Sequence, residues 1–430
     1  MLLALALVAS LGKDVPTRDF HDYVRRPDAS FTFSAGQAQG TRTDISLTSQ
    51  TWQGIPWKHT IVVLQPAKLE FKGRAILHIT GGEPNAKETA EYQLAANMAG
   101  VPIAALYNIP NQPLWGMNED DLIAHTFEKY LETGDPSWPL LFPMAKSAIR
   151  AMDAVQGASK GTSNPIRKFM VTGASKRGWT TWFVGISGDK RVDGIAPLVI
   201  DNLNVTKQMK HQLASWGKYS EQIEDYTRRG LQQKTETDPR GKRLAEMIDP
   251  YSYRSTIKVP TMIINGGNDR YWAVDALSQY WDDLRQPKWA QVVPNVGHSL
   301  VENRYMAMET LIAFSRSLAG EFTMPALSWK FDEENENGER SALVQLKSAK
   351  TPLANASVWM VTSDTLDFRP AKWERVAITS TTPPALEVNP TLRVGLPRGK
   401  NVALLGEFRY RVNGREFSLS TPVRVFPAMK

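Results

Sequence analysis

Apolar runs alternate with helix-like segments from about Phe31 to Ala319 of this 430-residue chain. The runs that resemble buried strands are Ile61–Gln65, Ala75–Ile79, Ile103–Tyr107, Phe169–Thr172, Gly194–Ile200, Thr261–Asn265 and Ala290–Pro294. Helical patterns such as KETAEYQLAANMAG and DALSQYWDDLRQ lie between them. Continuous apolar strands that alternate with helices are typical of a mostly parallel sheet covered on both faces. We therefore expect an α/β fold.

The character of the sequence changes after Phe322. A polar loop, EENENGER, is followed by segments that alternate apolar and polar residues with a period of two. The end of the chain contains two such segments joined by Asn413-Gly414, a strong hairpin signal. We therefore expect residues 325–430 to form a separate antiparallel β-sandwich.

A long insertion separates the strand that ends at Ile200 from the strand that begins at Thr261. Residues 203–258 are mostly helix-like and carry 11 Lys/Arg and 7 Asp/Glu. A helical excursion at the carboxyl end of a strand often covers an active site. We interpret this segment as a helical cap; the alternative is a solvated helical appendage.

One of the strands leads into a turn that is typical of a serine nucleophile. The stretch FMVTGASKRGWTTW, residues 169–182, joins an apolar run to a helical pattern through Gly173 and Ser175. Such a sharp strand-to-helix turn usually reads G-x-S-x-G. Here Arg177 occupies the second glycine's position and Gly178 comes one residue later. We interpret Ser175 as a nucleophile on a variant turn, with the Arg177 side chain leaving toward the solvent or the cap.

A serine hydroxyl needs a histidine to accept its proton and a carboxylate to orient that histidine. In an α/β-hydrolase the chain order is Ser, then Asp or Glu, then His, each just after a strand. Asp269 follows the strand TMIIN, and His298 follows the strand AQVVP, so both fit this order. Asp201 also follows a strand and is the alternative acid. We expect an α/β-hydrolase domain over residues 11–322 with the triad Ser175, Asp269 and His298.

The oxyanion formed in such a reaction needs backbone N–H donors. One is the N–H group of Lys176, directly after the nucleophile, and the other comes from the loop after an earlier strand. The strand Ala75–Ile79 leads into Thr80-Gly81-Gly82, where glycine permits close approach to a ligand. Gly81 and Gly82 are therefore the candidates for the second donor.

Other features of the sequence exclude some classes of protein. Cysteine is absent, and neither a zinc motif nor a nucleotide-binding glycine loop occurs, so we expect no metal and no cofactor. The net charge is +7, but no run of five basic residues occurs, so nucleic acid is not an expected partner. The apolar run Leu2–Ala9 is too short to span a membrane. We interpret residues 1–10 as the remnant of a signal peptide, which predicts a secreted or periplasmic protein without an integral membrane span.

The chain resembles the PhoPQ-activated pathogenicity-related family of secreted α/β-hydrolase-like proteins. The similarity runs from about residue 20 to 315, in the stretches LTSQTWQG, IPNQPL, WPLLFPMAKSAIRAMDAVQ, VTGASKRGWTTW, DPYSYR and VPNVGHSL. The resemblance implies an α/β-hydrolase core and export, with Ser175, Asp269 and His298 at the triad positions. A turn with the same late glycine occurs in glucuronoyl esterases, where a basic residue after the serine helps to hold the oxyanion, a role that Lys176 would take here. Arg270 departs from this picture, because it could pair with Asp269 and compete with the histidine.

Three functions fit these residues. The first is a serine esterase that acts on a small-molecule or carbohydrate ester through an acyl-enzyme. The second is a secreted binding or signalling protein that keeps the fold without turnover, and the third is a serine peptidase. If the cap covers the site, its basic residues line the mouth and favour an anionic substrate. The candidates for this lining are Lys207, Lys210, His211 and Lys218, with Lys176 beside the nucleophile.

Overall fold

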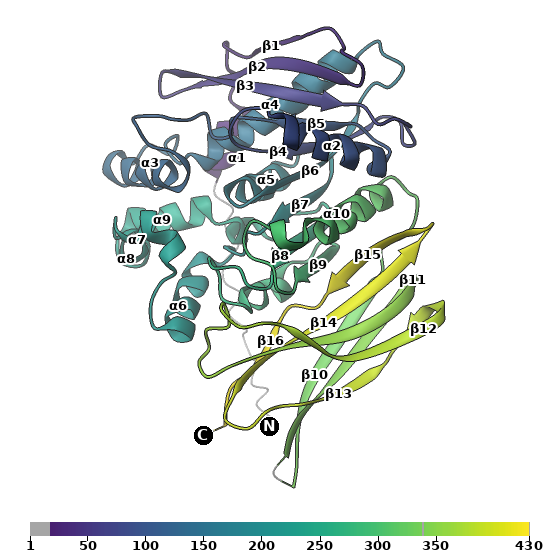
Figure 1. Cartoon of the computed structure of the whole chain (residues 1–430). Coiled ribbons are helices and arrows are strands. Elements are labelled where there is room, and N and C mark those ends of the chain that lie inside the picture. Colours follow the sequence, from purple (N-terminus) through teal and green to yellow (C-terminus); the bar gives the residue numbers. More distant parts are fainter. Residues whose placement is uncertain (1–17, 338, 430) are drawn as a thin grey trace, which may run out of the picture.

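Figure 1 shows the computed structural model, which describes residues 18–337 and 339–429. The signal segment predicted at residues 1–10 lies outside these residues. One hydrogen-bonded sheet runs through the whole molecule, with its first nine strands in the order β1-β2-β3-β5-β4-β6-β7-β8-β9. These strands are β1 (Thr32–Ala35), β2 (Arg42–Trp52), β3 (Ile55–Leu64), β4 (Arg74–Ile79), β5 (Ile103–Leu106), β6 (Lys168–Ala174), β7 (Val192–Leu198), β8 (Thr261–Gly266) and β9 (Lys288–Val293).

Six neighbouring strands are mutually parallel: β5, β4, β6, β7, β8 and β9. The other three, β1, β2 and β3, pair antiparallel at the edge of the sheet. The predicted parallel sheet is therefore confirmed, with an antiparallel margin. The carboxyl ends of parallel strands meet at one edge of a sheet, and ligands of such folds bind there. This arrangement brings the loops after β4, β6, β7, β8 and β9 to the same edge.

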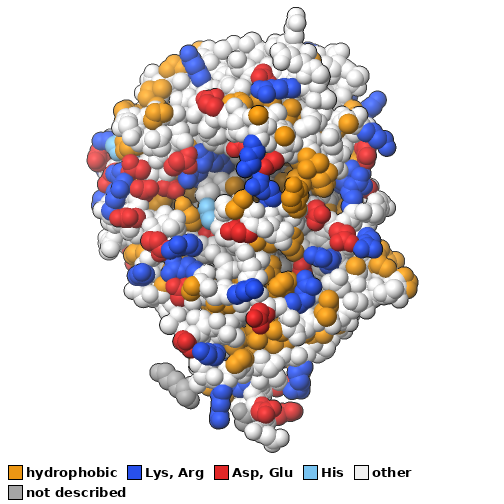
Figure 2. All heavy atoms as spheres, in the orientation of Figure 1, with side chains coloured by type: hydrophobic (Ala, Val, Ile, Leu, Met, Phe, Trp, Pro, Cys, Tyr) orange, Lys and Arg blue, Asp and Glu red, His pale blue; other side chains and the backbone are white. Residues whose placement is uncertain are grey.

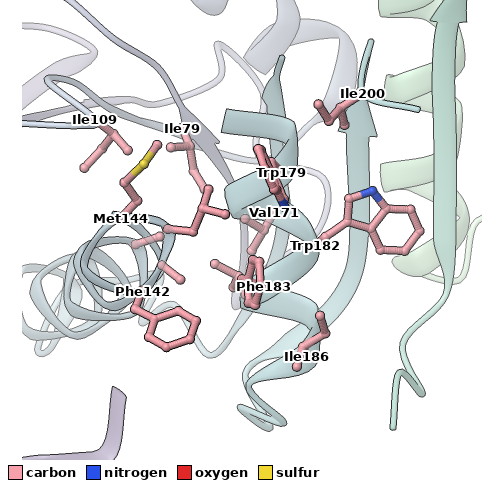
Figure 3. Packing of buried hydrophobic residues seen from close by; sticks show 14 of the residues in the cluster. Ile79, Ile109, Phe142, Met144, Val171, Trp179, Trp182, Phe183, Ile186 and Ile200 are labelled. Carbon is pink, nitrogen blue, oxygen red and sulfur yellow. The ribbon is translucent and has the colours of Figure 1, made fainter. Parts of the chain in front are cut away.

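Helices cover both faces of the sheet (Figure 1). One face carries α1 (Arg18–Arg25), α4 (Leu141–Ser159) and α5 (Lys176–Ile186), and the other carries α2 (Ala86–Ala99) and α10 (Arg304–Leu318). Figure 3 shows how the first face packs: Ile79 and Val171 from the sheet lie against Phe142 and Met144 of α4 and Phe183 of α5. This close packing fixes α5, and with it the turn that carries Ser175.

The segment between β7 and β8 is helical, as its sequence indicates. It contains α6 (Val205–Trp216), η1 (Glu221–Ile223), α7 (Glu224–Thr227), α8 (Leu231–Thr237), α9 (Pro239–Ile248) and η2 (Pro250–Tyr253). Helix α3 (Glu119–Thr133) packs beside α7, α8 and α9. Figure 2 shows acidic and basic side chains interleaved on this side of the molecule. The segment thus docks on the core through charged contacts as well as apolar ones.

The C-terminal strands pair antiparallel with one another, as predicted. They are β10 (Ala326–Glu336), β11 (Glu339–Ser363), β12 (Glu374–Val388), β13 (Thr391–Gly395), β14 (Asn401–Val412), β15 (Arg415–Ser420) and β16 (Arg424–Phe426). The hairpin at Asn413-Gly414 is confirmed, because Val412 pairs with Arg415 and both turn residues have positive φ.

These strands are not separate from the core, in contrast to the expectation from sequence. Ser420 of β15 pairs with Ala290 of β9, so the antiparallel strands extend the sheet of the core. A single buried cluster also contains Ile264 and Phe314 from the core together with Phe408 from β14. The remaining short helices are η3 (Ala276–Gln279), η4 (Trp281–Asp283) and η5 (Val301–Asn303). Among the residues described, no helix combines the length and apolarity needed to cross a membrane.

Candidate active site

Ser175 occupies a strained turn between β6 and α5. Its backbone has φ 57° and ψ −126°, a combination that side-chain-bearing residues rarely adopt. The Ser175 N–H group donates to the Leu198 carbonyl at 2.9 Å, and the Trp179 N–H group donates to the Ser175 carbonyl at 2.9 Å. These contacts hold the serine at the carboxyl edge of the sheet. Strain that is maintained in this way is typical of a nucleophile turn.

Two glycines make the turn possible. A Cβ atom on Gly173 would lie 2.8 Å from the Arg177 carbonyl oxygen, and one on Gly178 would lie 2.7 Å from Cγ2 of Ile200 and 2.8 Å from the Leu198 carbonyl oxygen. All three distances are shorter than real Cβ contacts, so the helix and the strands approach closely only because these side chains are missing. The late glycine, Gly178, thus provides the close packing.

Arg177 does not leave toward the solvent or the cap, as its sequence position suggested. Its Nε atom donates to the Ile109 carbonyl at 2.6 Å, and its two Nη atoms donate to the Glu119 carboxylate at 2.7 and 2.6 Å. The guanidinium lies where a Gly81 side chain would be, because a Cβ atom there would be 2.1 Å from an Arg177 Nη atom. Gly81 therefore makes room for Arg177, and neither Gly81 nor Gly82 lines the cavity at Ser175.

Lys176 follows Ser175, and its side chain is buried and paired. Its Nζ atom lies 2.8 Å from Glu119 and 3.0 Å from Asp120. Burial by itself would raise the pKa of Glu119, but hydrogen bonds and charge from Arg177, together with Lys176, lower that pKa to about 2. The positive charge beside Ser175 is therefore already matched by carboxylates.

The loops after β8 and β9 bring Asp269 and His298 together. Nδ1 of His298 lies 2.7 Å from Oδ2 of Asp269, and the other Asp269 oxygen accepts the Tyr271 N–H group at 2.8 Å. The Tyr271 ring stacks on the imidazole with their centroids 4.1 Å apart. The histidine ring is thus held on one edge and on one face. The sequence analysis did not identify Tyr271, and its only signal was an aromatic residue two positions after the acid.

The second imidazole nitrogen points to no partner. Nε2 of His298 is buried and makes no hydrogen bond to any described residue, and Ser175 is therefore not bonded to it. Both residues nevertheless line the same cavity. Catalytic hydrogen bonds are often long in the absence of substrate and shorten in its presence. The imidazole is thus oriented by Asp269 and keeps a buried, unpartnered nitrogen at the cavity that Ser175 also lines.

The alternative acid, Asp201, has another partner. The Tyr280 hydroxyl donates to Asp201 Oδ1 at 2.5 Å, and burial raises the pKa of Asp201 to about 7. No hydrogen bond joins Asp201 to His298 in the described structure. Arg270, the predicted competitor for Asp269, instead pairs with Glu221 of the cap segment. Of the two candidate acids, only Asp269 contacts the histidine.

The cavity at Ser175 lies between the core and segment 203–258. Its empty volume is about 920 Å³, counting the part that is open to solvent. Apolar and aromatic side chains dominate its lining: Phe127, Trp179, Ile200, Val205, Met209, Ile223, Tyr226, Leu231, Leu244, Ile248, Tyr271 and Trp272. Helices α6, α7, α8 and α9 all contribute, so the segment covers the serine.

The four basic cap residues do not line this cavity, contrary to expectation. Lys207 donates to the Gln279 carbonyl, Lys210 lies 3.8 Å from Glu236, and His211 lies 2.6 Å from Asp275. The pKa of Asp367, in the loop after β11, is lowered mainly by its hydrogen bonds to Arg369, and the charge of Lys218 adds to this effect. None of these basic groups lines the cavity, and of their partners only Glu236 does. In the described part of the chain, no three carboxylate or imidazole side chains form a group that could hold a metal ion.

The strand order and the strained turn at Ser175, between β6 and α5, define an α/β-hydrolase fold. The chain belongs to the PhoPQ-activated pathogenicity-related protein family, whose sequence pattern matches residues 20–369. The autocrine proliferation repressor protein A of Dictyostelium discoideum is 29% identical over 394 residues, which cover 86% of this chain and 78% of that protein.

Similar solved structures have only distant sequences. An acetyl xylan esterase from Paenibacillus sp. R4 has a TM-score of 0.49 at 15% identity, covering 69% of this chain and 93% of its own. Acetyl xylan esterase 1 from Thermoanaerobacterium sp. has a TM-score of 0.48 at 15% identity, covering 71% of this chain and 96% of its own. Similarities this distant say nothing about the substrate of this protein.

Proposed function

We propose that this protein is a serine hydrolase that cleaves a carboxylic ester through an acyl-enzyme. Ser175 Oγ attacks the ester carbonyl while His298 Nε2 accepts its proton, and Asp269 stabilises the imidazolium. The histidine then gives the proton to the leaving alcohol, and a water molecule releases the acyl group by the same route in reverse. The Lys176 N–H group at the start of α5 is the first oxyanion donor, whereas Gly81 and Gly82, the sequence candidates for the second, do not line the cavity.

The observation that carries the proposal is the state of His298. One ring nitrogen is held by Asp269 at 2.7 Å, whereas the other is unpartnered and belongs to the cavity that Ser175 lines. A histidine with only a structural role would satisfy both nitrogens or expose one to bulk water. A base that is oriented on one side and free on the other is what nucleophile activation requires.

The lining of the cavity favours an uncharged, apolar ester. Its charged members are Asp120, Lys176 and Glu236, and each has a partner of opposite charge or a hydrogen-bond donor. A bound carboxylate would meet acidic side chains with no unpaired cation to compensate them. The expectation of an anionic substrate, which depended on the cap lysines, therefore has no support. A carbohydrate ester would fit this cavity only through an apolar acyl group.

The first test is labelling with a fluorophosphonate probe, which reacts with activated serines. We expect the wild type to be labelled and Ser175→Ala not to be. Ser187→Ala, at the end of the same helix, is the matched control because Ser187 Oγ donates to the Val184 carbonyl and lies outside the cavity. Equal labelling of Ser175→Ala and the wild type would disprove the role of Ser175.

The second test separates the two candidate acids. Replacing Asp269 by asparagine removes the carboxylate that orients His298, and we expect kcat on 4-nitrophenyl butyrate to fall roughly 10⁴-fold, as in other triads. Asp201→Asn keeps a hydrogen-bonding group opposite Tyr280 and should retain most activity. The opposite ranking of the two variants would make Asp201 the working acid.

A binding or signalling protein without turnover is the second candidate. It is favoured by the missing hydrogen bond between Ser175 and His298, and by the name of the Dictyostelium relative, which describes a repressor of proliferation. Under this alternative the cavity holds an apolar ligand that is not cleaved. Folded wild-type protein that neither reacts with the fluorophosphonate nor hydrolyses 4-nitrophenyl esters would favour it over the esterase.

A further inference from the structure

We propose that loop 364–373, which joins β11 to β12 in the C-terminal strands, positions the two loops that carry Asp269 and His298. The inference rests on the proposed function for its catalytic consequence. The geometry itself can be tested without turnover. The sequence predicted a separate domain over residues 325–430, whereas the contacts made by this loop connect these residues directly to the site.

The loop first contacts the turn that carries the acid. Asn268, which directly precedes Asp269, donates through Nδ2 to the carbonyls of Arg369 at 3.1 Å and Ala371 at 2.7 Å. The Trp373 indole N–H group donates to the Gly267 carbonyl at 3.1 Å. The two residues before Asp269 are thus each bonded to loop 364–373. A shift of this loop would be transmitted to the carboxylate.

The same loop contacts the turn that leads to the histidine. The Trp373 N–H group donates to Oδ1 of Asn295 at 2.8 Å, and Nδ2 of Asn295 donates back to the Trp373 carbonyl at 3.0 Å. Asn295 lies three residues before His298 and has φ 60°, which asparagine tolerates better than most residues. The two turns are also joined directly, because the Asn268 N–H group donates to the Val296 carbonyl at 2.9 Å.

The loop is rigid enough to act as a support. The side chains of Phe368 and Trp373 are buried, in one apolar cluster with Val292 of β9 and with Val361 and Leu405 of the C-terminal strands. Buried aromatic side chains fix both the loop and the direction of its polar groups. Because Val292 is part of the strand that precedes the histidine turn, this cluster couples the two regions a second time.

The loop also holds one end of the cap. Arg369 bonds to Asp367 at 2.7 Å and to Glu221 of η1 at 3.2 Å, and its guanidinium lies 3.8 Å from the centre of the Trp216 ring. Glu221 is also the partner of Arg270, directly after the acid. Arg369 therefore connects the turn that carries Asp269 and the cap segment to the C-terminal strands.

Within the described residues, no member of loop 364–373 lines the cavity at Ser175. Trp373, Asn268 and Asn295 are therefore positioning residues, which act through the orientation of Asp269 and His298. Misplacement of a catalytic group by a fraction of an ångström lowers the rate of the chemical step more than substrate binding. Loss of the support should consequently appear in kcat and in the Asp269–His298 hydrogen bond.

The experiment compares Trp373→Phe with Trp359→Phe in the full-length protein. Each change keeps an aromatic ring, which is buried at position 373 and partly buried at position 359. Each removes one indole hydrogen bond, to Gly267 in the first case and to Glu407 within the C-terminal strands in the second. We expect Trp373→Phe to lower kcat on 4-nitrophenyl butyrate about tenfold with KM within about twofold. Trp359→Phe should match the wild type. Thermal unfolding of all three proteins verifies that they are folded.

A second measurement does not depend on activity. We expect the proton between His298 and Asp269 to give a downfield ¹H NMR resonance, which would be assigned by its loss in His298→Gln. We expect Trp373→Phe, but not Trp359→Phe, to shift or broaden it. An unchanged resonance, or equal kcat values for the two variants, would overturn the inference. If the wild type neither hydrolyses the ester nor reacts with the fluorophosphonate probe, the proposed function fails. In that case the NMR resonance alone decides whether loop 364–373 orients His298.

Discussion

At the scale of single residues, the site depends on how side chains share the space around one strained turn. Gly173 lets α5 approach β6, Gly178 lets it approach the end of β7, and Gly81 admits the guanidinium of Arg177. Arg177 in turn donates a hydrogen bond to Glu119, whose carboxylate also forms an ion pair with Lys176. Replacing the usual second glycine by arginine is tolerated because the next residue supplies the missing space and a carboxylate receives the charge.

The residue Gly178 gives the first prediction. In Gly178→Ala the new Cβ would meet Ile200 at 2.7 Å and the Leu198 carbonyl at 2.8 Å, so helix and strand must separate. We expect a loss of about 1–3 kcal/mol in the free energy of unfolding and slower fluorophosphonate labelling. Gly395→Ala is the control, since a Cβ on this strand residue has nothing within 4 Å. Urea denaturation measures both variants, and equal stability would contradict the prediction.

Asp201 gives a prediction about pH. Burial raises its pKa to about 7, from an unfolded value near 4. The protonated carboxyl therefore contributes its full stability below about pH 4, and this contribution is lost as the pH rises through about 7. Asp201→Asn cannot ionise and should lack this loss. We expect the stability of the variant relative to wild type to rise between about pH 5 and about pH 7.5, measured by urea denaturation; a constant difference would refute the assignment.

At the scale of elements, the cap is held on the acidic side of α3. Arg229 lies 2.5 Å from Asp121 and also pairs with Glu128, and Arg228 pairs with Asp121. The Tyr226 hydroxyl donates to Asp120 at 2.9 Å, close to Lys176 and the serine. The cap segment is thus fixed on one side by α3 and on the other by Arg369 of loop 364–373.

Weakening the ion pairs between α3 and the cap segment should make the segment more accessible to proteases. In Arg229→Ala the carboxylates of Asp121 and Glu128 lose a largely buried partner. We expect limited proteolysis by thermolysin within residues 203–258 to become about fivefold faster, equivalent to about 1 kcal/mol. Lys210→Ala is the control because its side chain is 68% exposed and lies 3.8 Å from Glu236. Equal cleavage rates for the two variants would show that α3 does not hold the cap.

At the scale of the whole molecule, the hydrolase core and the C-terminal strands share one sheet and one buried cluster. β15 continues the sheet beside β9, and Phe314 of α10 belongs to the same cluster as Leu346 of β11 and Phe408 of β14. Removal of the C-terminal strands would expose the apolar side chains of the core that face them.

This continuity predicts cooperative unfolding. We expect calorimetry to show one transition for the full-length protein, because neither part keeps a complete core without the other. A chain that ends at residue 322 should aggregate or lose its native near-ultraviolet circular dichroism. Two resolved transitions, or a folded and active truncated chain, would instead establish the independent domain that the sequence suggested.

The sequence by itself determined the α/β class, the order of Ser175, Asp269 and His298 after their strands, and the hairpin at Asn413-Gly414. Each of these follows from local information: strands are recognised by runs of apolar residues, and turns by glycine and asparagine where φ must be positive. Chain order then limits which strand ends can meet at one edge of the sheet.

Only the tertiary structure determined which residues the charged and polar side chains contact. Arg177 donates hydrogen bonds to Glu119, which lies 58 residues away along the chain, and Asn268 donates to the Ala371 carbonyl, which lies 103 residues away. Lys207 and Lys210, which the sequence assigned to the site, instead contact Gln279 and Glu236 and do not line the cavity. Side-chain electrostatics and hydrogen bonding act over a few ångströms in space whatever the separation along the chain, so no local pattern encodes them. The support of the site by the C-terminal strands emerges only when distant segments are folded together.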